Sequence, residues 1–154
     1  NSTCKYSASW WCNIMDNKMK GKNMKWLVKE KDCTENDSSR IEKKFDVILP
    51  SDYVELVLKH NGAYPEFKIY DTVTNKENMV QVLLSCADEP MNVDEVTSLI
   101  NLKGVVAFFA DPFGNYLCFQ YSIDNNYQIV LWNHETRTLE VICDNFSDFL
   151  NKLY

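Results

Sequence analysis

The stretch Phe109-Ala-Asp-Pro-Phe-Gly-Asn-Tyr-Leu-Cys-Phe-Gln-Tyr121 places four turn-forming residues between two apolar runs. Asp111 at the first position, Pro112 at the second and Gly114 at the fourth are typical of a type I turn, after which the glycine can adopt a positive φ and begin a bulge. Aspartate in this position also bonds the backbone nearby in sequence. We therefore predict a β-hairpin in which Asp111 is first of all a turn residue.

Two further turns extend this hairpin into a meander. Val105–Ala110 is continuously apolar, as expected for a strand covered on both faces. Asp124–Asn126 and His134–Arg137 are polar turn clusters, and an apolar run follows each of them. We predict four antiparallel strands, over residues 105–110, 116–121, 127–132 and 139–143.

Helical spacing precedes and follows the meander. Capping residues, a proline suited to a first turn and apolar side chains three and four positions apart predict helices over residues 35–45, 50–61, 93–102 and 145–153. The alternation at Phe67–Tyr70 predicts a strand. Met79–Cys86 fits a strand or a short helix, and we interpret it as a strand. Helices, then a meander, then a helix indicate an α+β fold.

Composition indicates one soluble domain. The chain has 154 residues, of which 45% are hydrophobic and 25% charged, as in ordinary globular proteins. No apolar run approaches the roughly 18 residues of a membrane helix, and the first residues lack the plan of a signal peptide. We expect a cytoplasmic protein. Cys86, Cys118 and Cys143 lie in apolar runs, so we expect reduced core thiols.

Charge is distributed unevenly along the chain. Residues 1–49 hold ten Lys/Arg and seven Asp/Glu, a net charge of +3, whereas residues 50–154 hold six and fifteen, a net charge of −9. An acidic main body disfavours nucleic acid, whose phosphates require a basic surface. It would attract a basic protein surface instead.

Residues 1–25 show no sustained period. A short amphipathic helix over residues 10–19 is one interpretation, and an extension that is not native to the domain is another. Met24 begins a segment that reads like an ordinary N-terminus. We therefore place the domain at residues 26–154.

A series of motifs runs through that domain. They are Ile41-Glu42, Leu49-Pro-Ser-Asp-Tyr53, His60-Asn-Gly-Ala-Tyr-Pro65, Phe108-Phe-Ala-Asp-Pro-Phe-Gly-Asn115, Tyr116-Leu-Cys-Phe119, Ile129-Val-Leu-Trp-Asn-His-Glu135 and Cys143-Asp-Asn-Phe-Ser-Asp-Phe-Leu150. In this order they resemble the SUKH superfamily of Smi/Knr-like domains. Gln120 stands where many relatives have aspartate, so no acidic pocket is carried over to that position.

The resemblance implies a compact α+β domain with a mostly antiparallel central sheet and no catalytic activity. It also implies one of two roles. Bacterial members are typically immunity proteins that bind and neutralise a partner toxin, often a nuclease. Fungal relatives regulate cell-wall synthesis and signalling, so a regulatory or scaffolding module is the alternative.

An enzyme would need a nucleophile and a base. Cys118 or Cys143 with His134 and Glu135 is the one arrangement worth naming, but both thiols belong to buried strand patterns and no motif accompanies them. The sequence has no Cys-x-x-Cys, no standard zinc spacing and no glycine-rich phosphate loop. We expect no catalytic residues, no metal and no cofactor.

Exposed acidic and aromatic positions are the candidates for binding a protein partner. The corner that contains Trp132, His134 and Glu135 combines an aromatic anchor with a charged rim, as binding hot spots do. Acidic helix positions would steer a basic toxin, although each is by default a solvated charge. We name Asp52, Glu55 and Asp111 with the corner as candidate partner-binding residues, and note the further acidic pairs Asp88-Glu89 and Asp94-Glu95.

Overall fold

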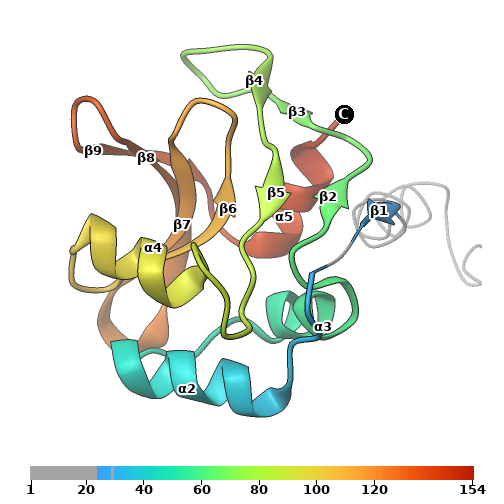
Figure 1. The fold of residues 1–154 in the computed structure, drawn as a ribbon. Coiled ribbons are helices and arrows are strands. Elements are labelled where there is room, and N and C mark those ends of the chain that lie inside the picture. The colour runs from blue at the N-terminus through green and yellow to red at the C-terminus, as the bar shows by residue number, and fades with distance from the viewer. Residues whose placement is uncertain (1–23, 29) are drawn as a thin grey trace, which may run out of the picture.

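The computed structural model describes residues 24–28 and 30–154, so the helix expected over residues 10–19 lies outside the described part of the chain. Four α-helices and a mostly antiparallel set of strands form an α+β domain (Figure 1). The helices are α2 (Glu35–Phe45), α3 (Ser51–His60), α4 (Val93–Ile100) and α5 (Phe146–Lys152). The strands are β1 (Trp26–Leu27), β2 (Tyr64–Pro65), β3 (Ile69–Tyr70), β4 (Asn78–Met79), β5 (Val82–Leu83), β6 (Val105–Ala110), β7 (Tyr116–Tyr121), β8 (Tyr127–Asn133) and β9 (Thr138–Cys143), with a 3₁₀ turn at Ile123–Asn125.

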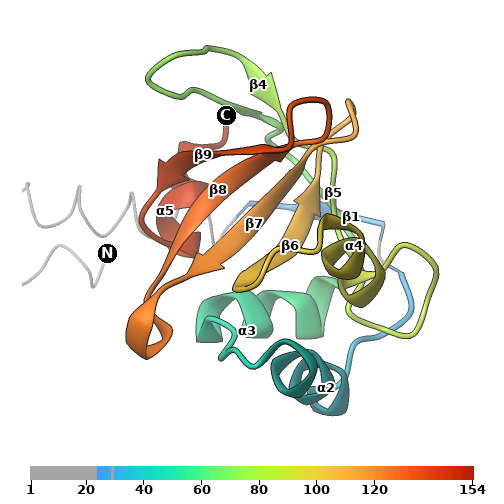
Figure 2. The same ribbon diagram turned by 90° about the vertical axis from the view of Figure 1, so that its left-hand side faces the viewer.

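The predicted meander is confirmed as the centre of the main sheet. Its five strands lie in the order β5-β6-β7-β8-β9, all antiparallel, so β5 adds one strand beside β6 (Figure 2). Two small ribbons, β1–β2 and β3–β4, lie outside this sheet. The three connections within the meander are short turns, which make neighbours of consecutive strands, whereas residues 84–104, which include α4, connect β5 to β6.

The single strand predicted over Met79–Cys86 is wrong. The amide of Val80 donates to the carbonyl of Lys68 at 2.8 Å, whereas the next amide, that of Gln81, donates to the carbonyl of Ala110 at 2.8 Å. Consecutive residues therefore pair with different segments, and the run splits into the end of β4 and β5. The strand at Phe67–Tyr70 is likewise shortened to β3.

The turn between β6 and β7 has the predicted hydrogen bonds and the predicted positive φ at its glycine. Asp111 Oδ1 accepts hydrogen bonds from the amides of Phe113 at 2.8 Å and Asn115 at 2.9 Å, and Gly114 has a φ of +88°. The bulge lies elsewhere, where the β6–β7 register shifts between Ala107 and Phe109. The turn thus sets the hairpin, while the bulge lets two adjacent phenylalanines pack against the same helix.

Helix starts follow their capping residues. Thr34 forms a capping box with Asp37 at the start of α2, and the side chains of Asn92 and Asn145 accept hydrogen bonds at the starts of α4 and α5. Pro50 directly precedes α3, as expected for a residue that suits the first turn. These local bonds satisfy amide groups that have no partner within the helix.

Aromatic side chains fill the core between the sheet and the helices α3 and α5. The Tyr53 ring lies 5.9, 5.0 and 5.5 Å from those of Phe108, Phe119 and Phe146, and the Phe108 and Phe119 rings stack at 4.2 Å. Phe149 contacts the rings of both Phe108 and Phe109. α4 lies on the opposite face of the sheet from α5 (Figure 1), where the hydroxyl of Thr97 accepts a hydrogen bond from the Ala107 amide at 3.0 Å.

Candidate protein-binding surface

A groove between α3 and α5 contains two of the predicted residues, Asp52 and Glu55. Its volume is about 200 Å³. Buried or half-buried apolar side chains form the floor, and charged side chains of α3 form the rim. The groove is lined by Trp26, Asp52, Glu55, Leu56, Lys59, His60, Phe146, Ser147 and Leu150. We refer to it as the α3–α5 groove.

The two carboxylates of this groove have different surroundings. Asp52 is half-buried and accepts a hydrogen bond from the hydroxyl of Ser147 at 2.6 Å, which joins α3 to α5. Glu55 lies one turn further along α3 and is exposed. Asp52 therefore links the two helices that form the groove, and Glu55 is the carboxylate that is exposed to a binding partner.

An unpaired indole also lines the α3–α5 groove. The ring of Trp26 stacks on His60 with a centroid distance of 6.4 Å and tilts against Phe109 at 6.2 Å. Its Nε1 atom is buried and has no hydrogen-bond partner among the residues that the structure describes. Buried indole nitrogens usually donate a hydrogen bond to an acceptor. The wall of the α3–α5 groove that contains Trp26 therefore has a hydrogen-bond donor without a partner among the described residues.

Of the three residues predicted to form one corner, Trp132 lies in the core, and His134 and Glu135 lie at the surface. Trp132 is 7% exposed and stacks on Tyr116 at 6.2 Å, so its ring belongs to the sheet. His134 and Glu135 are exposed at the β8–β9 turn. Asn115 Oδ1 accepts from the His134 amide at 3.0 Å and lies 2.8 Å from His134 Nδ1, which makes Nδ1 the protonated nitrogen.

Asp111 is buried, with 9% of its surface exposed, and its carboxylate is occupied by the turn amides described above. Both turn amides bond to Oδ1 of Asp111, so its role in the turn is the one that the structure shows, and a contact with a partner stays a prediction. The β6–β7 and β8–β9 turns lie at the opposite end of the sheet from α3 (Figure 2). The six predicted residues are therefore not one site.

A second, larger groove lies between α2 and α4. Its volume is about 780 Å³, and it is lined by Arg40, Lys44, Asp88, Glu89, Asn92, Asp94, Glu95, Ser98 and Leu99. We refer to it as the α2–α4 groove. Both noted acidic pairs lie here, and four carboxylates face two cationic side chains, so its rim is net acidic.

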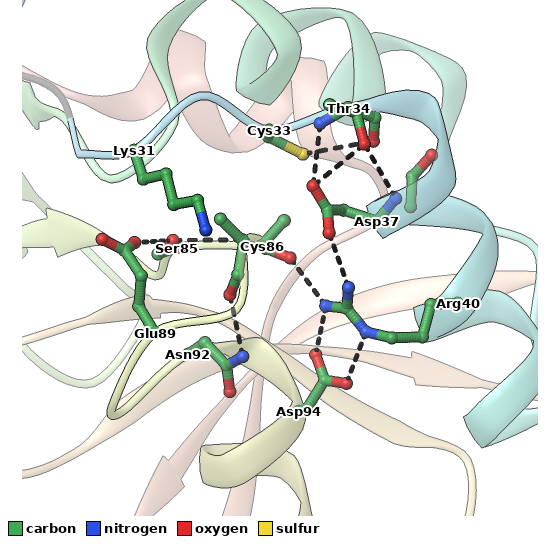
Figure 3. A network of polar contacts seen from close by, with 12 residues as sticks. Lys31, Cys33, Thr34, Asp37, Arg40, Ser85, Cys86, Glu89, Asn92 and Asp94 are labelled. Carbon is green, nitrogen blue, oxygen red and sulfur yellow. Dashed lines mark hydrogen bonds and ion pairs between the residues drawn. The ribbon is translucent and has the colours of Figure 1, made fainter.

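Not all of these carboxylates are solvated as expected. Asp94 accepts from Arg40 Nε at 3.0 Å and from Arg40 Nη2 at 3.1 Å, and Glu89 accepts from the hydroxyl of Ser85 (Figure 3). Asp88 and Glu95 remain exposed. The hydrogen bonds to Asp94, together with one to Asp37, raise the pKa of Arg40 although partial burial opposes this, so the guanidinium stays charged.

The cysteine arrangement weighed for catalysis is not assembled. Burial raises the pKa of the Cys118 thiol and raises that of Cys143 to about 12, so neither forms a thiolate near neutral pH. Cys118 contacts the Tyr116 carbonyl and Cys143 that of Asn145, whereas His134 contacts Asn115 and Glu135. Among residues 24–28 and 30–154, no cluster of three His, Cys, Asp or Glu side chains has the geometry to hold a metal ion.

Two exposed apolar residues at these surfaces were not predicted from the sequence. Phe113, at the tip of the β6–β7 turn, is 64% exposed, and Leu99, on the rim of the α2–α4 groove, is 63% exposed. Phe113 directly precedes the turn glycine, Gly114, and this position in a turn could have indicated that its side chain is exposed. Leu99 follows the helical period, so its sequence gives no reason to place it outside the core.

Comparison with known proteins identifies the family. The model of the family described as SMI1-KNR4 cell-wall, SUKH_6, matches residues 35–150. This match runs from the start of α2 to within α5 and includes both grooves except for Trp26. No curated protein matches the chain. No helix in the described part of the chain is long and apolar enough to cross a membrane. Because the family model covers most of the chain, the protein belongs to the SUKH superfamily of Smi/Knr-like domains.

Proposed function

We propose that this protein is a non-enzymatic protein-binding domain, and specifically an immunity protein that binds and neutralises a basic toxin domain such as a nuclease in the cytoplasm. The observation that carries the proposal is the α3–α5 groove, where the exposed Glu55 and the ordered Asp52 lie beside an apolar floor. Protein–protein interfaces typically have an apolar centre surrounded by a polar or charged rim.

Charge supports a basic partner. The part of the chain from residue 50 onward has a net charge of −9, and both grooves have carboxylates on their rims. Complementary charge raises the rate of encounter before contacts form, and a partner selected in this way binds less well as salt rises. The same acidic body argues against a nucleic-acid partner.

Neutralisation requires only that the partner's active surface is covered. The thiols of Cys118 and Cys143 remain protonated at neutral pH and lie within the fold, so we assign them to packing and not to chemistry. Steric occlusion by a rigid domain accounts for inhibition without any reaction. No cofactor or metal is needed for it.

The second candidate is a regulatory module of the Smi/Knr type. The exposed Phe113 and the exposed corner residues His134 and Glu135 favour it, because they form a second surface at the other end of the sheet. A module with two separate surfaces can hold two partners. This role predicts several weak partners and no protection of cells.

The test begins with capture of partners from the source cells by tagged protein. The toxic domain of a captured partner is then expressed alone, with the wild-type chain, and with Glu55→Lys. Immunity predicts survival with the wild type and at least about a tenfold loss of survival with the variant, because reversed charge at a contact weakens complementary binding. Glu95→Lys, at an exposed carboxylate in the other groove, is the matched control and keeps protection.

Two outcomes would contradict the proposal. If no captured partner is toxic, the immunity role is wrong and the regulatory role gains support. If Glu95→Lys abolishes protection while Glu55→Lys retains it, the contact surface is the α2–α4 groove and the assignment to the α3–α5 groove is wrong.

A further inference from the structure

Two cysteines that are far apart in the sequence meet beneath α2. Cys33 lies directly before the capping residue of α2, and Cys86 lies in the loop between β5 and α4. Both are free thiols, buried in the same core cluster, and they lie close enough to share a hydrogen bond.

Polar contacts hold the two segments in this position. The guanidinium of Arg40 donates to the Cys86 carbonyl at 2.8 Å and to Asp37 at 2.6 Å, and Asp37 accepts from the Thr34 amide at 2.9 Å (Figure 3). The residue after Cys33 is thus connected through two side chains to the backbone of Cys86. These contacts hold the two segments that carry the thiols beside each other.

The two thiols are not equivalent. The hydrogen bond with Cys86 lowers the pKa of Cys33 although burial opposes this, whereas the same bond and burial raise the pKa of Cys86. Cys86 also lies 3.1 Å from the hydroxyl of the buried Tyr53. Both cysteines lie in segments without regular secondary structure, but Cys33 retains 5% exposure, whereas Cys86 is fully buried. Cys33, the more accessible of the two, is therefore assigned as the attacking residue and Cys86 as the resolving thiol.

We propose that Cys33 and Cys86 form a reversible disulfide when the protein meets a peroxide. The Cys33 thiolate attacks one peroxide oxygen, the O–O bond breaks, and the released hydroxide takes up a proton to become water. Cys33 is then a sulfenic acid. The Cys86 sulfur attacks the Cys33 sulfur, the S–O bond breaks, and the hydroxide leaves with the proton of Cys86 as a second water. Two thiols and one hydrogen peroxide thus give one disulfide and two waters.

The bond would link the two helices of the α2–α4 groove. Cys33 directly precedes the cap of α2, which supplies Arg40 and Lys44, and Cys86 precedes α4, which supplies most of the opposite wall. Irregular backbone around Cys33 allows the sulfurs to approach from hydrogen-bond contact to bonding distance. Oxidation would therefore fix the spacing of these helices without touching the α3–α5 groove, so this inference does not depend on the proposed function.

Peptide mapping of the full chain tests the proposal. The protein is treated with a small excess of hydrogen peroxide, quenched with catalase, alkylated under denaturing conditions without reductant and digested with trypsin. Cleavage after Lys31 and Arg40 releases residues 32–40 with Cys33, and cleavage after Lys76 and Lys103 releases residues 77–103 with Cys86. The expected product is these two peptides joined, lighter by two hydrogens than their sum, and separated again by dithiothreitol.

Variants and a stability measurement sharpen the result. Cys33→Ser is expected to abolish the joined peptide and leave Cys86 alkylated, whereas Cys143→Ser, the matched control, retains it. The oxidised wild type is expected to unfold at a temperature roughly 5 °C or more above the reduced form. Recovery of both Cys33 and Cys86 as alkylated thiols from the wild type after peroxide, or linkage of Cys33 to another cysteine, overturns the proposal without need of any variant.

Discussion

Arg40 Nε and Asp94 Oδ2 lie 3.0 Å apart although the two residues are 54 positions apart in the sequence. A second bond joins Arg40 Nη2 to Asp94 Oδ1 at 3.1 Å, so the pair is bidentate. Through this pair α2 is joined to α4. The pair also neutralises one of the four carboxylates of the α2–α4 groove.

Arg40→Lys is expected to destabilise the fold by about 1–2 kcal/mol, because lysine cannot reproduce a planar bidentate pair together with the bond to the Cys86 carbonyl. Chemical denaturation of the variant and the wild type measures the difference. Lys44→Arg, at a cation 4.0 Å from the same carboxylate, is the control and stays within about 0.5 kcal/mol. Equal stability of all three proteins would show that the bidentate geometry contributes nothing.

Asp111→Ala is expected to cost about 1 kcal/mol, because it removes the side-chain acceptor of the partly buried turn amides of Phe113 and Asn115. Asp111→Asn retains a side-chain oxygen and is expected to lose less than half as much. Urea unfolding midpoints compare the three proteins. A loss of partner binding by Asp111→Asn at unchanged stability would instead identify Asp111 as a contact residue.

Asp37 makes the start of α2 sensitive to acid. Burial opposes the shift, but hydrogen bonds from Thr34 and Arg40 lower the pKa of Asp37 below its usual value. A carboxyl whose folded pKa is depressed contributes stability above its unfolded pKa of about 4 and loses it as the pH falls through the lower folded value. Unfolding free energies from pH 6 down to about pH 2 are expected to fall less steeply for Asp37→Asn than for the wild type. Parallel curves would contradict this assignment.

Phe108→Ala is expected to cost about 3–5 kcal/mol, because the fully buried ring contacts Tyr53, Phe119, Phe146 and Phe149. Phe113→Ala changes the same residue type at a position that is 64% exposed and is expected to stay within about 0.5 kcal/mol. Thermal unfolding of the two variants separates a core role from a surface role. A cost at Phe113 equal to that at Phe108 would mean that the hairpin tip is packed.

Local signals predicted most of the elements. The caps at Thr34 and Asn145, and the proline before α3, define helix starts by bonds within a few residues, and the structure confirms all three helices. The meander follows from turn residues in the same way. Val80 and Gln81 show the limit, because their amides pair with segments 12 and 29 positions away, and nothing in the local sequence distinguishes them from one continuous strand.

The candidate surface was predictable only in part. Helical periodicity placed Asp52 and Glu55 on α3, but the groove between them and α5 arises from packing of distant segments. The pairing of Asp94 with Arg40 and the meeting of Cys33 with Cys86 also depend on contacts more than 50 positions apart. Trp132 was predicted as an aromatic anchor for a partner, whereas its ring stacks on Tyr116 within the sheet and is 7% exposed.

The central claim is that a basic protein partner binds the α3–α5 groove, and side-by-side capture with tagged wild type, Glu55→Lys and Glu95→Lys tests it most directly. Each protein is incubated with lysate of its source cells, washed at low and then high salt, and the retained proteins are identified by mass spectrometry. The account predicts one stoichiometric basic partner that wild type and Glu95→Lys retain at low salt and release at high salt, and that Glu55→Lys fails to hold. Equal retention by all three proteins, or only weak and varied partners, would contradict it.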